Sequence, residues 1–123
     1  MVAGIIHQTI DEFKIKYESK PENIIVCIGP SISVINYEVG PEVIEKVINI
    51  TGDTNGIIRN LAKKEKGFLD LWELAKFQLV VHGIKTQNIE ISGICTYENF
   101  ADFYSARKEG FNTGRFCTGI VLN

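Results

Sequence analysis

The chain has 123 residues, of which 45% are apolar and 23% charged, and its formal net charge is −2. These values are ordinary for one soluble globular domain with a core of its own. The small net charge gives no general attraction to nucleic acid or to an acidic membrane surface, so we expect neither as a partner. No apolar run approaches the ~20 residues of a membrane span, and the first residues lack the pattern of a secretory signal.

The cysteines predict a reducing compartment. They number three, an odd count, and form no CxxC pair: Cys27, Cys95 and Cys117. Free thiols of this kind are typical of a cytoplasmic protein. Together with His7 and His82 they are the candidate soft metal ligands, but they are scattered along the chain without ligand spacing. We therefore expect no metal ion bound by this chain alone.

The N-terminal part predicts a helix followed by a buried strand. A helix to about residue 18 would have an apolar face made of Ile6, Ile10, Phe13 and Tyr17. The apolar run over residues 23–28 fits a strand buried on both faces, with Cys27 as a small hydrophobe inside it. The turn after it, Gly29 to Ser33, lies where open α/β sheets bind ligands. The hydroxyls of Ser31 and Ser33 either serve a site or close this turn, and chemistry alone favours the turn.

Two more helices and another strand follow. Gly40 and Pro41 suit the start of a helix, whose buried stripe would be Val43, Ile44, Val47 and Ile48. A third helix opens over residues 68–71 and runs to about His82, with Asp70 in its first turn, where it can cap the helix, and a core face of Leu71, Leu74, Ala75 and Leu79. Residues 57–67 fit either a short helix or an irregular excursion, and residues 88–92 predict a strand. This order predicts a mixed α+β domain with layered sheets covered by helices.

The last third of the chain carries a cluster of cations. Arg107, Lys108 and Arg115 lie close together before an expected final strand over residues 116–122. If the loop folds back as a hairpin, these cations converge, and an arginine fork suits phosphate or carboxylate. The alternative is an exposed hairpin whose cations stay in water. Tyr97 and Tyr104 either wall an aromatic pocket or pack as core rings.

Three segments together resemble a known family. They read IGPSIS…YEVG.EV over residues 28–43, FLDLWELAKFQLVVHGI over 68–84 and CTYEN…FYSARKEG.NTGR over 95–115. In this order they resemble the C-terminal half of the laccase-domain family, also called multicopper polyphenol oxidase-like, many of whose members are purine nucleoside phosphorylases. Residues 1–123 would then form a single partial domain of the laccase-domain fold. This family usually has an aromatic residue before its arginine pair, as in SYRR, whereas this chain reads SARK over residues 105–108, with Ala106 at the aromatic position.

The resemblance implies an activity and a cofactor for the intact enzyme. The activity is phosphorolysis of purine nucleosides, with phosphate as co-substrate and adenosine deamination as a companion. The cofactor is one zinc, held by two histidines and a cysteine, and no residue of this chain matches those ligands. We therefore expect a fragment that is inactive alone and that positions substrate, with these substrate-binding candidates: Arg107, Arg115, Lys108 and Tyr97.

Two other functions remain open. The chain can be a non-catalytic α/β module that associates with itself or with a missing N-terminal half, because a partial domain leaves apolar surface exposed. On this ground we expect a homo-oligomer. A hydrolase that uses Cys95 as its nucleophile is the third possibility, although no histidine partner lies near it in the sequence.

Overall fold

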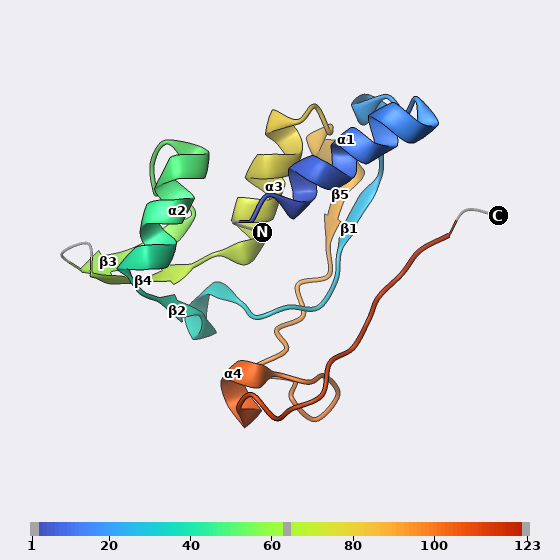
Figure 1. Ribbon diagram of the computed structural model, residues 1–123. Coiled ribbons are helices and arrows are strands. Elements are labelled where there is room, and N and C mark those ends of the chain that lie inside the picture. The colour runs from blue at the N-terminus through green and yellow to red at the C-terminus, as the bar shows by residue number, and fades with distance from the viewer. Residues whose placement is uncertain (1–2, 63–64, 122–123) are drawn as a thin grey trace.

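The computed structural model describes residues 3–62 and 65–121 (Figure 1). Its helices and strands are α1 (Ile5–Tyr17), β1 (Val26–Ile28), β2 (Glu38–Val39), α2 (Pro41–Thr51), β3 (Ile58–Ala62), β4 (Lys66–Leu69), α3 (Leu71–Val81), β5 (Ile89–Ile91) and α4 (Ala106–Glu109). Short 3-10 helices occupy Pro21–Asn23, Val34–Asn36 and Thr86–Asn88. The predicted mixed α+β class is confirmed, because two small sheets pack with the helices around two apolar clusters.

The first sheet is antiparallel, with strand order β2-β4-β3. Residues 57–67 supply much of it, so the expectation of a short helix or an irregular excursion was wrong. Ile58 pairs with Leu69 and Arg59 with Phe68, and the register then shifts before Ala62. Asn60, with φ of 52°, lies in this irregular part. This register shift is a β-bulge, and it interrupts the alternation of apolar and polar residues by which a strand is recognised in a sequence.

The second sheet is a parallel pair, β1 and β5, with Val26 opposite Ile89 and Ile28 opposite Ile91. The strand predicted after the third helix is therefore confirmed as β5. The first strand was predicted too long and too buried, since it covers only three residues and Cys27 is exposed. Val26 and Ile28 pack on the apolar cluster of α1 and α3, while Cys27 points to the other side of the strand, because successive side chains alternate.

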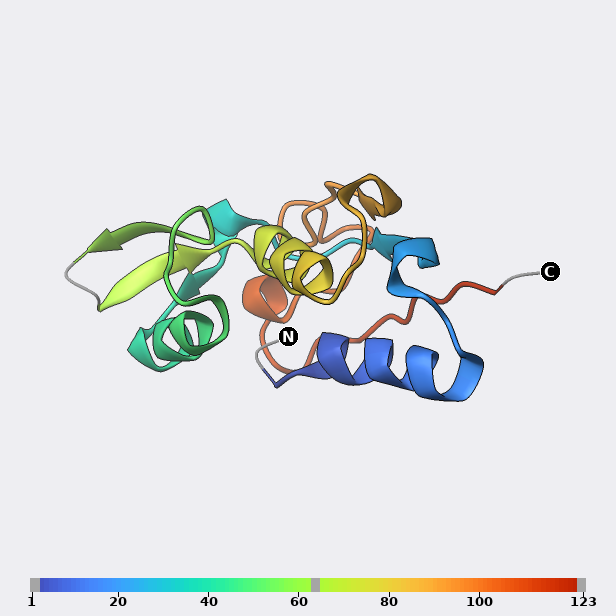
Figure 2. The same cartoon turned by 90° about the horizontal axis from the view of Figure 1, so that it is seen from above.

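Helix α3 joins the two halves of the molecule. It lies between α2 and α1 in both Figure 1 and Figure 2. Leu74 is fully buried in the cluster formed with α2 and the antiparallel sheet, and Leu79 is buried in the cluster formed with α1 and the parallel pair. The predicted cap is confirmed, because the Asp70 carboxylate accepts a hydrogen bond from the Glu73 backbone N–H at 3.2 Å.

Helix α1 uses less of its apolar face than its pattern indicates. The predicted helix is present, but only Ile10 of the expected face is fully buried. Phe13 is 42% exposed and Tyr17 71% exposed. Helical spacing identifies the apolar stripe correctly, but it does not show how much of that stripe the other elements cover.

The C-terminal part differs most from its prediction. Residues 116–121 belong to no strand, and residue 122 lies outside the described part. In Figure 1 this segment leads away from the region around α4 without joining a sheet. A strand needs a neighbour for its backbone hydrogen bonds, and none is assigned to it within residues 3–62 and 65–121. The loop before it forms α4 and a turn rather than the expected hairpin.

Candidate functional site

A cleft of about 670 Å³ lies where the loops after β1 and β5 meet the start of α3 and the region of α4. Its lining residues are Ser31, Ile32, Tyr37, Leu71, Thr96, Tyr104, Ser105, Ala106, Arg107 and Phe111. The carboxyl ends of parallel strands are the usual place for a ligand in an α/β sheet. The turn at Gly29 to Ser33 therefore contributes directly to a cleft wall, as its position after a strand indicated.

The floor of the cleft is fixed by backbone bonds that extend the pairing of β1 with β5. Ser31 and Cys95 form an isolated parallel bridge. The Ser31 N–H donates to the Ile94 carbonyl at 3.1 Å, and the Thr96 N–H donates to the Ser31 carbonyl at 3.1 Å. Because both backbone groups of Ser31 are used, its position in the cleft is set by the sheet.

Ser31 and Ser33 have different surroundings. The Trp72 indole N–H donates to Ser31 Oγ at 2.7 Å, and Ser31 lines the cleft. Ser33 is buried, and its Oγ accepts a hydrogen bond from Asn36 Nδ2 at 3.3 Å. Each of the two expected roles thus applies to one of these serines. The Ser33 hydroxyl closes the turn, while Ser31 faces the cleft.

Cys95 is a buried thiol at the junction of these loops, with 4% of its surface exposed. Its Sγ accepts hydrogen bonds from the Ser33 backbone N–H at 3.3 Å and from Asn36 Nδ2 at 3.6 Å. Burial acts to raise the pKa of this thiol, but hydrogen bonds from Ser33 and from the amides of Glu98 and Tyr97 outweigh it and place the pKa below its usual value. The sulfur is not among the cleft-lining groups, and its contacts tie two loops together.

Arg107 brings a positive charge to the cleft. Its Nη1 donates to the Glu38 carbonyl at 3.1 Å, and its Cζ lies 5.0 Å from the centroid of the Tyr37 ring. The side chain is therefore held against β2 and the aromatic wall. A guanidinium has five N–H donors, so one bond to a carbonyl leaves donors for an anion in the cleft.

The other sequence candidates lie outside the cleft lining. Lys108 and Tyr97 contact each other, since the lysine Nζ is 4.9 Å from the tyrosine ring centroid, and the same Nζ is 5.1 Å from the Phe100 ring centroid. Arg115 Nη1 donates to the carbonyls of Thr113 and Gly114, both at 2.8 Å. The structure thus brings Lys108 and Tyr97 together but does not place either of them, or Arg115, with Arg107.

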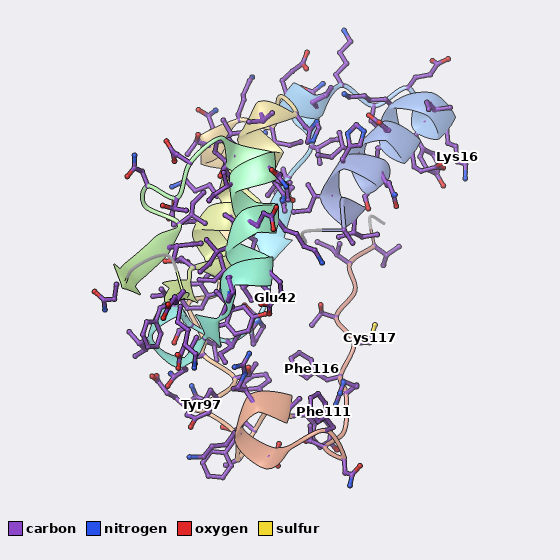
Figure 3. All side chains as sticks on the ribbon, turned by 60° about the vertical axis from the view of Figure 1, so that its left-hand side comes forward. Lys16, Glu42, Tyr97, Phe111, Phe116 and Cys117 are labelled. Carbon is purple, nitrogen blue, oxygen red and sulfur yellow. The ribbon has the colours of Figure 1, made fainter. Side chains whose placement is uncertain are left out.

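Aromatic rings form much of the cleft wall. Tyr104, one of two tyrosines considered for such a wall, does line it, and Tyr37 and Phe111 were not anticipated. Figure 3 shows Phe111 on the side of α4 that faces the C-terminal segment. A Cβ on Gly114 would come within 2.7 Å of the Tyr104 ring, so this glycine lets the backbone approach the tyrosine rather than a ligand. No local pattern marks Phe111, which is 93% exposed.

The described residues do not fit a zinc centre. Within residues 3–62 and 65–121, no group of three or more His, Cys, Asp or Glu side chains could hold a metal ion. His7 and His82 stack on each other with ring centroids 4.7 Å apart, and His7 Nε2 lies 3.2 Å from an Asp11 carboxylate oxygen. Among the same described residues, no helix has the length and apolar character needed to cross a membrane.

Comparison with known proteins gives consistent matches over almost the whole chain. The family model described as multi-copper polyphenol oxidoreductase laccase matches residues 1–123. A purine nucleoside phosphorylase of Bacteroides thetaiotaomicron is 34% identical over 122 residues, which are 99% of this chain and 45% of that protein. The adenosine deaminase RL5, from an unknown prokaryotic organism, is 32% identical over 117 residues, 95% of this chain and 45% of its own length.

A solved structure shows the same arrangement. The crystal structure of YlmD from Geobacillus stearothermophilus superposes with a TM-score of 0.83 at 26% identity, covering 92% of this chain and 42% of that one. The chain therefore spans about half the length of the relatives that it matches.

Proposed function

Since the chain belongs to the multi-copper polyphenol oxidoreductase laccase family, we propose that it forms the substrate-positioning half of a purine nucleoside phosphorylase, with adenosine deamination as a companion activity. The observation that carries this proposal is the cleft, in which a cation and aromatic rings face the same space. The names of the relatives, a purine nucleoside phosphorylase and an adenosine deaminase, support the substrate class.

The lining of the cleft suits the two parts of such a substrate pair. Tyr37, Tyr104 and Phe111 offer apolar faces for a purine ring. Arg107 offers N–H donors for phosphate and for the charge that develops as the glycosidic bond breaks. We propose that Lys108, Tyr97 and Arg115 hold the loop around this site, because each already has a partner within it.

Zinc belongs to the proposal only for the intact enzyme. The sequence resemblance implies one zinc, and its ligands would have to come from outside the described residues. The chain's own contribution is to bind and orient nucleoside and phosphate, and we expect no turnover from it alone. Binding rather than catalysis is therefore the appropriate readout.

The proposal is tested by titrating the chain with inorganic phosphate and, separately, with inosine, followed by heteronuclear NMR. Arg107→Ala should weaken phosphate binding about 10- to 100-fold, since hydrogen bonds to charged groups contribute about 1.5–3 kcal/mol. Lys46→Ala is the control, because it removes a positive charge from the exposed face of α2, outside the cleft lining, and should bind phosphate like the unmodified chain. Equal losses in both variants, or no binding of either probe by the unmodified chain, would contradict the proposal.

A further inference from the structure

We propose that Ser31 is a ligand-binding residue of the cleft and that Trp72 orients its hydroxyl to donate a hydrogen bond to an acceptor oxygen of the ligand. This inference rests on the proposed function, because it assigns a further residue to the same site. The acceptor oxygen belongs either to phosphate or to the nucleoside, and the two probes used below distinguish these sources.

Ser31 has a fixed position in the cleft. Its backbone N–H and carbonyl are hydrogen-bonded to Ile94 and Thr96, and these bonds continue the pairing of β1 with β5. Its side chain lines the cleft, and so does Arg107. A group held by a sheet rather than by a mobile loop loses little freedom when a ligand binds, so it is suited to orient that ligand.

The bond from Trp72 sets the direction of the Ser31 hydroxyl hydrogen. An indole N–H only donates, so the bond from Trp72 uses a lone pair of Ser31 Oγ. The serine hydrogen must then point away from the indole. Among the described residues, no protein group accepts a hydrogen bond from Ser31 Oγ, although a hydroxyl beside a partly apolar wall needs an acceptor. The hydroxyl is therefore available to a group in the cleft.

Trp72 is held in place by helix α3. Trp72 lies in the first turn of α3, two residues after the capping residue Asp70, and Leu74 anchors the same turn in the core. The indole is thus fixed relative to the sheet by a helix that packs into both apolar clusters. Ser33, two residues away from Ser31, instead accepts its hydrogen bond from Asn36 within its own loop. Both serine hydroxyls accept a hydrogen bond, but from different partners, and only Ser31 lines the cleft, which makes Ser33 a control.

The test uses the intact 123-residue chain, in which Trp72 is the single tryptophan. Its fluorescence is recorded while inorganic phosphate alone, and then inosine alone, is added. A ligand that hydrogen-bonds Ser31 should change the indole emission, since the indole and the ligand share one hydroxyl. Ser31→Ala should weaken binding of at least one probe about 3- to 10-fold. Ser31→Thr, which keeps a hydroxyl, should retain most of the affinity.

The role of Trp72 is tested by a second variant, and Ser33 provides the control. Trp72→Phe keeps an aromatic ring but removes the donor, so it should weaken the same probe by about 2- to 3-fold in NMR titrations, where tryptophan is not needed. Ser33→Ala should leave both affinities unchanged once circular dichroism shows that it is folded. If Ser31→Ala binds both probes normally while Arg107→Ala does not, this inference is overturned and the proposed function stands. If the unmodified chain binds neither probe, both are overturned.

Discussion

The carboxylate of Glu109 makes two hydrogen bonds within the loop that carries Arg107. One of its oxygens accepts hydrogen bonds from the Ser105 backbone N–H at 3.0 Å and from the Thr113 hydroxyl at 2.8 Å. The Ser105 bond and then the Thr113 bond hold the pKa of this carboxyl below its usual value. Although the carboxylate is on the surface, it adds to the backbone hydrogen bonds of the turn around α4, in which the Glu109 N–H donates to the Ser105 carbonyl at 2.8 Å.

We predict that acid opens this turn. A carboxyl whose pKa is lowered by folding stabilises the fold above its unfolded pKa, and this contribution is lost as the pH falls through the folded pKa. The amide signals of Ser105 and Thr113 should therefore titrate together by NMR, with a midpoint below the ordinary glutamate value of 4.5. Glu109→Gln should remove that transition. A midpoint at or above the ordinary value would contradict the assignment.

At the scale of elements, α3 is the part on which both apolar clusters depend. Leu74 is fully buried, and Val81 on the same helix is 64% exposed. Leu74→Ala should lower the free energy of unfolding by about 2–5 kcal/mol, through lost burial and a cavity. Val81→Ala should change it by less than about 0.5 kcal/mol. Urea denaturation of both variants is the measurement, and similar losses in the two would show that the helix is not packed as described.

The elements that the sequence predicts well are those whose pattern is local. The core face of α3 repeats at helical spacing, and Asp70 stands at the cap position. The β3–β4 hairpin was missed because its bulge at Asn60 breaks the strand pattern. Residues 116–121 have the composition of a strand, but they pair with no strand in the described part of the chain, and pairing is a property of the fold rather than of the segment.

The candidate site was predictable only in part, for a similar reason. The cluster of cations in the sequence suggested both Arg107 and Arg115, but only Arg107 lines the cleft, while Arg115 bonds to its own loop. The position of Ser31 after a strand hinted at a ligand. Its hydrogen bond with Trp72 spans 41 positions in the sequence, so only the folded chain shows it.

The whole molecule exposes much apolar surface. Large apolar side chains that are more than two thirds exposed include Ile15, Tyr17, Ile25, Ile35, Phe111, Ile120 and Val121. Ile120 and Val121 belong to the C-terminal segment. Figures 1 and 2 show that this segment extends to the opposite side from β3 and β4. Large exposed apolar patches favour association. We therefore propose that the isolated chain forms homo-oligomers, and that the C-terminal segment takes part.

Self-association through the C-terminal segment can be tested by substitution. Replacing Ile120 and Val121 with serine should weaken self-association at least about tenfold, because burying each aliphatic side chain contributes about 1.5–3 kcal/mol and 1.4 kcal/mol corresponds to a factor of ten. Sedimentation equilibrium over a range of concentrations measures the dissociation constant. Lys46→Ser, a change on the exposed face of α2, is the control and should associate like the unmodified chain. If the unmodified chain sediments as a monomer at every concentration, self-association is contradicted. If the double variant has the same dissociation constant as the unmodified chain, the contact lies elsewhere on the apolar surface.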